Sequence, residues 1–543
     1  MKKIMLRWGA LMALLISTMG LNQAQTNLGA DCGCPPVANR TTVVNLSTLC
    51  NVVGGDYVLS AANTILTCDK IWVIDQKIYV DTLKSITIMP GTLIYGLDNA
   101  GTPDNWKGLI VQRGAKIFAA GTEECPIVFT ANNDPLDGSF ATGTQGLWAG
   151  VAILGHATNN CVGTSGGTCK GDGLAIIEGF ATTNKRNYHG GGLTPNDDDN
   201  SGIIRHVSLR HTGATLAAGN ELQALSLGSV GRGTQIDHLE SISSDDDDIE
   251  LFGGTVNLKY IASAFGNDDM LDWDMGYSGK VQFYFGIKAP DTTAGPFGDS
   301  GIEADNDDGN DNSCPRSNPQ IYNATFIGND DRFPSSSDYS GPGGMMLKEF
   351  TFGQITNSIF ANFRAGFYLS NNEARPSSTC GGVAAAGDSY DNWVAGLLNI
   401  TNCHFIDCDY GFRLGNKAGI APSPSDEAKF LADGNVFTPS LAGFTHIWDM
   451  NSTTNAVTTQ FDVKPNTALT PVSTPPTDGF FTPAAYRGAF DPNGDNWLSS
   501  MSFMKVIEAT TGLVPCPADI NGDGLINTND FLEFGPKFGT SCE

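Results

Sequence analysis

Short apolar and β-branched runs alternate with glycine, asparagine and aspartate turns along most of the chain. Residues 85–96 and 109–117 are typical, since each joins two such runs through a turn that contains glycine. This pattern predicts short β-strands, and the periodicity of amphipathic helices is almost absent. Strands as short as these are stable only when a regular scaffold stacks them.

Two internal similarities indicate what that scaffold is. Residues 357–371 match residues 402–416, with asparagine, phenylalanine, glycine and leucine recurring in register. Residues 236–249 and 258–271 share a second pattern, in which a short strand is followed by an acidic turn. A coil of about 22 to 25 residues with three short strands is the repeat of a right-handed parallel β-helix. The sequence therefore predicts an all-β fold, a solenoid of this type with loop insertions.

Nine apolar side chains should point into the solenoid, and asparagines at its corners can form ladders between coils. The expected inward residues are Ile249, Leu251, Ile261, Phe360, Phe367, Leu369, Phe405, Phe412 and Leu414. Loops rich in Gly, Ser, Asp or Pro interrupt the coils and should project from one face or edge. They cover about 157–202, 288–318, 330–346 and 371–395.

The chain divides into five parts. Lys2, Lys3 and Arg7 precede an apolar stretch that is too short to span a membrane, which predicts a cleaved signal peptide. The predicted parts are a signal peptide (1–24), an N-terminal cap (25–60), the right-handed parallel β-helix (61–450), a Thr/Pro-rich linker and C-terminal cap (451–514) and a C-terminal tail (515–543).

Composition agrees with export. Thirteen cysteines suit an oxidising compartment. Cys161 and Cys169 are close enough in sequence to pair locally, as are Cys32 and Cys34. The odd number leaves at least one thiol free or shared between chains. We expect an exported protein, either extracellular or at the cell surface.

Charge excludes one class of partner. The formal net charge is −27, whereas binding to nucleic acid needs a positive surface. After the predicted signal peptide, no segment is apolar enough to predict a membrane span. An acidic exported protein of this kind is expected to be highly soluble, to bind divalent cations, or both.

The tail carries the oxygen ligands of a calcium loop at positions 1, 3, 5, 7, 9 and 12, with glycine at position 6. The ligand residues are Asp519, Asn521, Asp523, Leu525 through its carbonyl, Asn527 and Asp530. Bracketed by cysteines, the segment resembles half of a dockerin, a calcium-dependent module that ends many secreted bacterial proteins. A full dockerin has two loops and this tail has one. The resemblance implies Ca²⁺ as a cofactor and gives little support for a cohesin-type partner.

The densest acidic cluster spans residues 244–250 and 267–274. In the proposed register these segments stack on adjacent coils about 4.8 Å apart, where bare carboxylates repel and raise one another's pKa. Two outcomes stay open: Ca²⁺ bridges the coils, or a carboxylate pair performs acid–base chemistry on a glycosidic bond. The candidates for either role are Asp246, Asp247, Asp268, Asp269 and Asp272.

The residues around the acidic cluster bear on the choice between calcium binding and catalysis. The cluster resembles the paired aspartates of β-helical polygalacturonases, but the Asn-Thr-Asp, Gly-His-Gly and Arg-x-Lys motifs of that family are missing from this sequence. His238 is expected to be structural. Lys259 and Lys280 are the only cations expected nearby to balance the negative charge.

Four tryptophans are candidates for a sugar-stacking platform, although interior packing is an alternative for two of them. They are Trp106, Trp148, Trp273 and Trp393. The order of motifs also resembles a family of exported bacterial β-helix proteins, mostly of Bacteroidota type, for which no activity is implied. The matching segments include residues 90–92, 110–117, 126–130, 147–155, 252–256, 276–282 and 486–490.

Three functions remain as hypotheses. The first is a secreted or cell-surface, calcium-stabilised β-helix that binds a polysaccharide or another surface component. The second is a polysaccharide lyase or glycoside hydrolase that uses the acidic cluster of residues 245–274. The third is a purely structural surface protein. A lysine or arginine among the carboxylates of a long cleft would favour the enzyme, and a flat acidic face would favour binding or structure.

Overall fold

The structure is a computed structural model of the 543-residue chain. It describes residues 27–98, 105–136, 140–161, 165–166, 168–217, 220–288, 300–306, 313–329, 343–371, 378–380, 383–385, 388–415, 420–439, 450–451, 456–457, 463–465 and 467–504. The predicted signal peptide and the whole calcium-loop tail lie outside these ranges. Within them, no helix has the length and apolarity needed to cross a bilayer.

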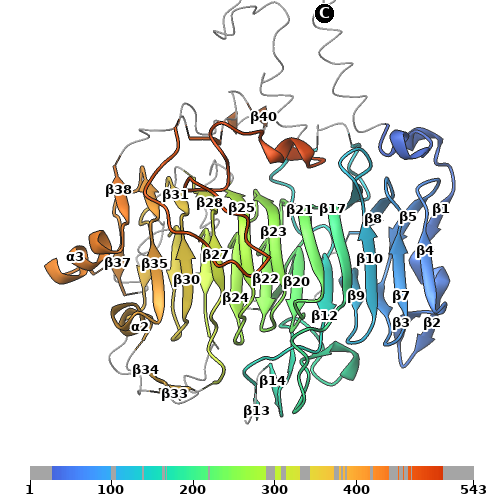
Figure 1. Cartoon of the computed structure of the whole chain (residues 1–543). Coiled ribbons are helices and arrows are strands. Elements are labelled where there is room, and N and C mark those ends of the chain that lie inside the picture. Colours follow the sequence, from blue (N-terminus) through green and yellow to red (C-terminus); the bar gives the residue numbers. More distant parts are fainter. Residues whose placement is uncertain are drawn as a thin grey trace, which may run out of the picture.

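The described chain winds into a parallel β-helix, and the predicted fold class is confirmed (Figure 1). One face is a sheet that we call sheet 1, whose strands pair in parallel except for the antiparallel pair β2 and β3. Its strands are β2 (Cys50–Val53), β3 (Asp56–Leu59), β6 (Lys77–Val80), β9 (Gly108–Val111), β12 (Val151–Leu154), β20 (Leu225–Gly228), β22 (Ile249–Phe252), β24 (Leu271–Asp274), β26 (Ile302–Ala304), β29 (Met345–Leu347), β32 (Tyr368–Leu369) and β37 (Arg413–Leu414).

The other two faces form one continuous parallel sheet, sheet 2, which folds around a corner of the solenoid. Its strands are β1 (Val43–Asn45), β4 (Asn63–Leu66), β5 (Ile71–Ile74), β7 (Ser85–Ile88), β8 (Leu93–Gly96), β10 (Lys116–Ala120), β11 (Ile127–Ala131), β17 (Gly202–Arg210), β21 (Gln235–Ile242), β23 (Asn257–Ala264), β25 (Lys280–Ile287), β27 (Gln320–Tyr322), β28 (Thr325–Ile327), β30 (Gly353–Thr356), β31 (Ile359–Ala361), β35 (Leu398–Thr401), β36 (His404–Ile406) and β38 (Val436–Thr438).

A single left-handed residue makes this corner in each of seven consecutive coils. These residues are His206, His238, Tyr260, Phe283, Asn323, Asn357 and Asn402. Asparagine tolerates positive φ because its short amide bonds locally. The aromatic residues instead stack on one another, with ring centroids 4.5 to 5.0 Å apart. The predicted structural role of His238 is visible here, since its ring lies between those of His206 and Tyr260.

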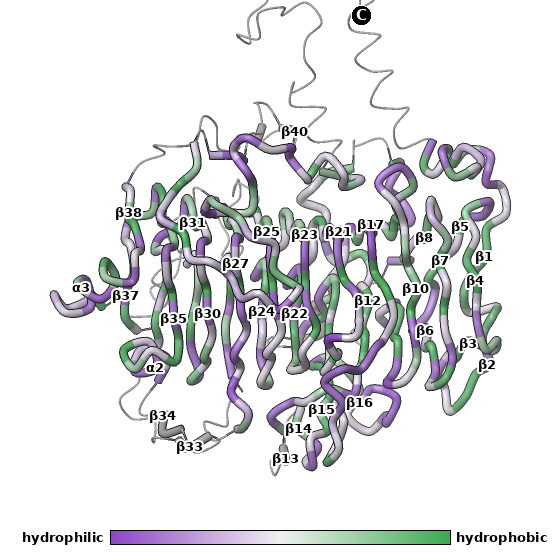
Figure 2. The backbone as a smooth tube through the Cα atoms, viewed as in Figure 1, coloured by the Kyte–Doolittle hydropathy of each residue, from purple (hydrophilic) through white to green (hydrophobic). Residues whose placement is uncertain are grey.

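Strand residues alternate between the core and the outside, as Figure 2 shows in the changing hydropathy along the strands. All nine residues predicted to point inward are buried members of one continuous core. Within it, Phe326, Phe360 and Phe405 stack on successive coils with centroids 5.4 and 5.6 Å apart. Stacking neighbouring coils buries apolar surface that a single coil would expose.

The predicted registers are also observed. Phe360 pairs with Phe405 and Leu369 with Leu414, which is the offset seen between residues 357–371 and 402–416. Pairing of β21 with β23 reproduces the second internal similarity. Parallel pairing already begins at Val43, so part of the range predicted as an N-terminal cap belongs to the coils.

Both ends of the core are closed. At the C-terminal end, α3 (Pro424–Ala432) inserts Phe430 against Phe405 and Phe412, and a capping box at Ser423 begins this helix. The helix α2 (Ser389–Ala395) adds Trp393 to the core. At the N-terminal end, Leu46 of the 3₁₀ turn η3 (Leu46–Leu49) joins the same core.

Disulfides fasten the N-terminal segment to the coils. Cys32 is bonded to Cys125 and Cys34 to Cys68, so pairing between Cys32 and Cys34 is wrong. Cys32 and Cys34 are two residues apart but form disulfides with cysteines on different coils. Their separation in the sequence cannot show this. The predicted local bond between Cys161 and Cys169 is confirmed. These disulfides are compatible with an exported protein.

Antiparallel additions interrupt the coils. In Figure 1 β13, β14, β33 and β34 lie along the lower edge of the solenoid. The additions are the four-stranded sheet β13 (Ser165–Gly166), β14 (Cys169–Gly171), β15 (Leu174–Ile176) and β16 (Tyr188–His189), and the pairs β18 (Ala214–Ala217) with β19 (Asn220–Leu222), β33 (Ser378–Cys380) with β34 (Val383–Ala385), and β39 (Met450–Asn451) with β40 (Ala456–Val457).

Residues 463–504, as far as they are described, run back along sheet 2 and form what we call the C-terminal strap (Figure 1). Asn357 donates to the Ser473 carbonyl at 2.7 Å, and the Gln282 side chain pairs with the backbone of Thr482. Further along, Phe490 packs on Phe285. Within the range predicted as a linker and C-terminal cap, 451–514, these residues pack on the solenoid, because their apolar side chains form a core with sheet 2.

Candidate metal centre

A column of carboxylates runs along the outer face of sheet 1. Alternation turns Ile249 and Leu251 inward, so Glu250 between them points outward on β22. The same alternation places Asp272 outward on β24 and Glu303 outward on β26. Register pairs Glu250 with Asp272 and Asp272 with Glu303, which stacks the three on successive coils.

The turns before β22 and β24 add the predicted aspartates. The Asp269 N–H donates to Asp247 Oδ1 at 2.8 Å, which fixes the two turns one above the other. Asp269 in turn accepts the Ser300 N–H at 2.5 Å. Each aspartate thus bonds the backbone of the following coil, and this holds the carboxylates of consecutive turns in register.

Two groups of three carboxylates result, and they share one member. The first comprises Asp246, Asp247 and Asp268, and the second comprises Asp247, Glu250 and Asp272. Within each group one oxygen per residue lies within 4.8 Å of the others. We call them the acidic triads. Of the five residues predicted from the sequence, four belong to a triad, and Asp269 supports the turn beside them.

All three carboxyls of the second triad are shielded from solvent. Asp247 and Glu250 are each 6 % exposed and Asp272 is 8 % exposed. Glu250 Oε2 and Asp272 Oδ1 are buried without a hydrogen-bond partner. Leaving a buried carboxylate oxygen unpaired is costly, so such an atom indicates a missing ligand.

Burial and mutual repulsion shift the acidity of the whole group. Burial, followed by the charge of Asp268, raises the pKa of Asp246 well above its usual value. Burial and Asp246 do the same to the pKa of Asp247, and burial and Glu178 to that of Glu250. These shifts favour the protonated form of each carboxyl, and a bound cation would oppose them.

One cation stands at the edge of the acidic column. Lys348 Nζ lies 2.6 Å from Glu303 Oε1 and 3.3 Å from Asp305 Oδ2. Burial alone would lower the pKa of Lys348, but Asp305 and Glu303 outweigh it and raise that pKa above its usual range. Lys348 therefore keeps its charge and neutralises one end of the column.

The prediction that Lys259 and Lys280 balance the cluster is wrong. Both lie on sheet 2, where Lys259 Nζ donates to the Phe480 carbonyl at 2.7 Å and Lys280 pairs with Asp478 at 2.5 Å. The triads lie on sheet 1, a different face of the solenoid. Neighbours along the sequence end on different faces here because each coil turns corners.

Comparison with known proteins identifies the solenoid. Residues 58–423 match the model of the pectate-lyase-like β-helix domain. The chain belongs to this family. A search of curated proteins finds no match. The matched range runs from sheet strand β3 past β37 and includes both acidic triads, so the triads are part of the family's solenoid and not of an appended domain.

The pectate-lyase-like solenoid holds acidic residues that sequence reasoning missed. Gln223 Nε2 donates to Glu178 at 3.1 Å and to Asp246 at 3.2 Å, and this amide links an insertion to the first triad. Glu303 and Asp305 extend the column on sheet 1. The outward position of Glu250 could have predicted an acidic residue at the same place on a later coil. The insertion between β25 and β26 breaks the repeat spacing, so this correspondence cannot be seen in the sequence.

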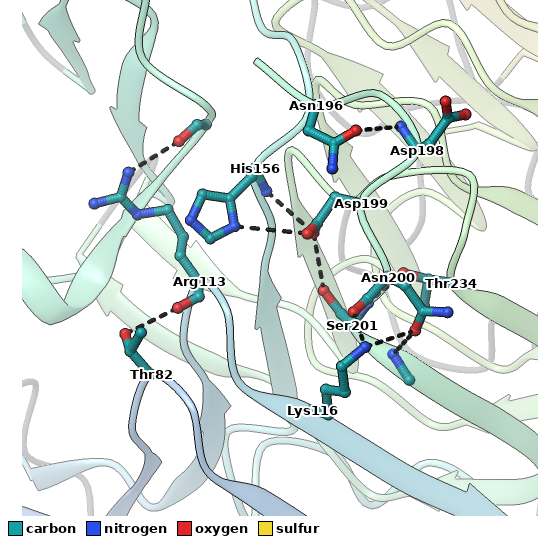
Figure 3. A network of polar contacts seen from close by, with 12 residues as sticks. Thr82, Arg113, Lys116, His156, Asn196, Asp198, Asp199, Asn200, Ser201 and Thr234 are labelled. Atoms are coloured by element: carbon teal, nitrogen blue, oxygen red, sulfur yellow. Dashed lines mark hydrogen bonds and ion pairs between the residues drawn. The ribbon is translucent and has the colours of Figure 1, made fainter. Parts of the chain in front are cut away.

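The acidic run of residues 197–199 is bound by protein groups (Figure 3). Asp199 accepts the His156 N–H at 3.2 Å and faces His156 Nδ1 at 3.6 Å. Asp197 accepts the Thr158 N–H at 3.0 Å. These carboxylates tie the loop to the solenoid. Residues 305–311 form a looser calcium-loop pattern in the sequence, and only Asp305 and Asn306 of them lie within the described residues.

The sugar platform predicted from tryptophans is wrong in this family member. All four side chains are buried, Trp106 at 5 % exposure and the others at 0 %. Trp148, Trp273 and Trp393 are core residues of the solenoid. Their indoles fill the interior of wide coils, a role that tryptophan can play at any inward strand position.

Proposed function

We propose that the protein is an exported, calcium-stabilised β-helix that binds a polysaccharide or another surface component. Membership of the pectate-lyase-like family supports a polysaccharide-related role in general. The disulfides described above are compatible with export. The finer claims, calcium and binding without cleavage, rest on the chemistry of the acidic triads.

The donor set fits a hard divalent cation. Calcium takes six to eight oxygen ligands and tolerates irregular geometry, and the triads offer carboxylates alone. The observation that carries the proposal is the pair of buried, unpartnered oxygens on Glu250 and Asp272, next to the shared Asp247. Ca²⁺ bound there would neutralise the charge and join consecutive coils.

Acid–base catalysis at the triads fits less well. The catalytic carboxyl groups of glycosidases are about 5–5.5 Å apart in retaining enzymes and about 6.5–9.5 Å apart in inverting enzymes. The triad oxygens lie within 4.8 Å of one another. Glu250 and Asp247 are also buried, while a polysaccharide chain needs an open approach. Close, buried carboxylates suit an ion better than a polymer.

The second candidate, a polysaccharide lyase or glycoside hydrolase, is favoured by one observation. Lys348 lies among the carboxylates, beside Glu303 and Asp305, as expected of an enzyme that contacts an anionic sugar. Against this role, a general base must release its proton near the working pH, and the pKa of Lys348 is raised. Lys348 would act as a charge partner before it would act as a base.

A polysaccharide panel separates the two candidates. The purified chain is incubated with acidic and neutral polysaccharides, with calcium or with a chelator, and both retention and new reducing or unsaturated ends are scored. Binding without new ends supports the proposed function. New ends that disappear with Lys348→Met or Asp272→Asn, in a protein of unchanged melting temperature, would establish the enzyme instead.

The tail extends this proposal. A single dockerin-like loop at residues 519–530 would bind a second Ca²⁺ and could retain the protein at a surface. This part rests on the sequence, because residues 505–543 lie outside the described structure. A cohesin-type partner is not part of the proposal.

A further inference from the structure

A second candidate site lies on sheet 2, on a different face from the acidic triads. It is a cavity of about 580 Å³ between the outer face of β17, β21 and β23 and the C-terminal strap. The strap contributes Gly479, Phe480 and Thr482 to its wall. Two segments about 220 residues apart in the chain therefore build it, and its volume is in the range of small-ligand sites.

Positive charge gathers in this cavity. Arg205, Asp237 and Lys259 occupy one outward column, since register pairs Arg205 with Asp237 and Asp237 with Lys259. Arg232 adds a third cation to the lining from the turn before β21. In a chain of net charge −27, the lining of this cavity holds three cations and one carboxylate, while Asp197 and Asp198 face Arg232 from outside the lining.

The one carboxylate in the column is already occupied. Asp237 accepts two bonds from Arg205, at 2.8 and 3.0 Å, and faces His238 Nδ1 at 2.8 Å. Gln235 donates a further bond to it. Asp237 therefore anchors Arg205 and has little capacity left to neutralise Lys259.

Lys259 binds neutral groups only. Its ammonium donates to the Phe480 carbonyl at 2.7 Å and to Thr482 Oγ1 at 2.8 Å, and lies 5.2 Å from the centre of the Phe480 ring. Among the described residues no carboxylate forms an ion pair with it. A partly buried cation that forms no ion pair, in a polar cavity, attracts an anionic group.

The cavity wall is held in place before any ligand arrives. Thr234 Oγ1, on the lining, accepts the Ser201 N–H at 2.8 Å, and Lys116 fixes the neighbouring Asn200 (Figure 3). Arg232 is positioned by Asp198 at 2.9 Å, on a carboxylate that is 77 % exposed. An exposed pair of this kind contributes little binding energy and can be exchanged for a ligand anion.

We propose that this cavity binds the anionic group of an acidic saccharide, a uronate carboxylate or a sulfate ester, against Lys259 and Arg232. The inference rests on the proposed polysaccharide-binding function and specifies its ligand class and its site. Thr234 and Asn257 are the polar lining groups that face sugar hydroxyls, and Tyr260 and Phe480 supply ring surface for the apolar face of a sugar. Two cations rather than a metal select the anion.

Calorimetric titration of the full-length protein tests the site. The probes are an oligogalacturonate, a sulfated oligosaccharide and a neutral oligosaccharide of similar length, each in EDTA so that calcium bridging does not contribute. We expect an acidic probe to bind, with an affinity that falls as sodium chloride is raised. Lys259→Met should weaken it by about tenfold or more through loss of a charge-assisted contact. The preferred acidic probe distinguishes uronate from sulfate.

Three further variants test whether the loss of binding in Lys259→Met comes from the lost charge. Arg232→Gln should also weaken binding, and it does not touch the strap. Thr482→Val removes one hydrogen bond of Lys259 but keeps the charge, so binding should persist. Lys84→Met is the matched control, since Lys84 also donates to backbone carbonyls and lies before β7, outside the cavity.

The outcomes separate this inference from the proposed function. If folded Lys259→Met and Arg232→Gln proteins bind the acidic probe as the native chain does, the cavity is not the site, while polysaccharide binding stands. Equal affinity for neutral and acidic probes overturns the anionic class in the same way. If the native chain binds none of a wide panel, with or without calcium, the proposed function itself fails.

Discussion

Asp247 is the residue on which both acidic triads depend, because each triad includes one of its oxygens. Asp247→Asn keeps an oxygen that can accept the Asp269 N–H but removes the shared charge. We expect calcium affinity of the solenoid to fall by at least about tenfold, about 1.4 kcal/mol. Isothermal titration measures it. Asp433→Asn is the control, since Asp433 pairs with Lys429 at the end of α3, outside the acidic column, and should leave the affinity unchanged; an equal loss in both variants contradicts the assignment.

The raised pKa values of two buried carboxyls predict how the stability of the protein depends on pH. Burial raises the pKa of Asp248 to about 7 from 3.8, and burial with Glu221 raises the pKa of Glu178 to about 7 from 4.5. A carboxyl whose folded pKa is raised stabilises the fold when protonated, so this stability is present below about pH 4 and is lost as pH rises through 7.

The metal-free protein should therefore melt at progressively lower temperature from pH 4 to pH 7. Calcium should reduce the decline, because it replaces protons on the triad carboxylates, whose pKa values are also raised. Thermal melts in EDTA and in calcium across this range measure both slopes. A flat profile in EDTA would contradict buried, unneutralised carboxyls.

At the scale of elements, the aromatic stack at the C-terminal end closes the core. Phe412 packs between Phe367 and Phe430, with centroids 5.1 and 5.3 Å away. Phe412→Ala should destabilise the protein by about 3–5 kcal/mol, since little nearby can fill the cavity. Denaturant unfolding measures the change. Phe437→Ala on β38 is the control, because Phe437 is 37 % exposed and should cost much less.

The strap depends on one buried acid of sheet 2. Glu240 is 1 % exposed and accepts the backbone N–H groups of Phe503 and Met504 as well as the Ser502 hydroxyl. Glu240→Ala should release this end of the strap, and limited proteolysis should then cut within residues 463–504. Glu123→Ala, at an exposed turn, should leave the fragment pattern unchanged. Resistance of the Glu240 variant would show that the strap is held elsewhere.

For the whole molecule, the repeating coils are easier to predict from the sequence than the insertions that interrupt them. The coils around β21 to β24 could be predicted, because strand alternation and corner residues recur there without an insertion between matching strands. The coils around β30 to β37 could be predicted because the same residues recur in register on both sides of the insertion at 371–395. Glu303 and Lys348 could not, since insertions shift them out of the repeat. The strap was missed because its apolar residues show no period, and burial against sheet 2 is a tertiary property.

The same limit explains the errors on individual side chains. A tryptophan on a strand looks the same from sequence whether it points in or out, and only the register shows that Trp273 on β24 points inward. Lys259 lies close to the acidic cluster along the chain but on another face. A residue can be assigned to a coil only when the strand register is known. It can be assigned to a face of the solenoid only when the position of every intervening turn is known.

The central claim is that calcium bound at the acidic triads holds the coils together. It is tested most directly by the melting temperature of the full-length chain carrying Asp523→Ala, which removes a central ligand of the predicted tail loop, in EDTA and in rising calcium. The account predicts a melting temperature that rises with calcium as RT ln(1 + [L]/Kd), and a rise that disappears when Asp247→Asn is added. A melting temperature that ignores calcium, or a rise that survives Asp247→Asn, would contradict it.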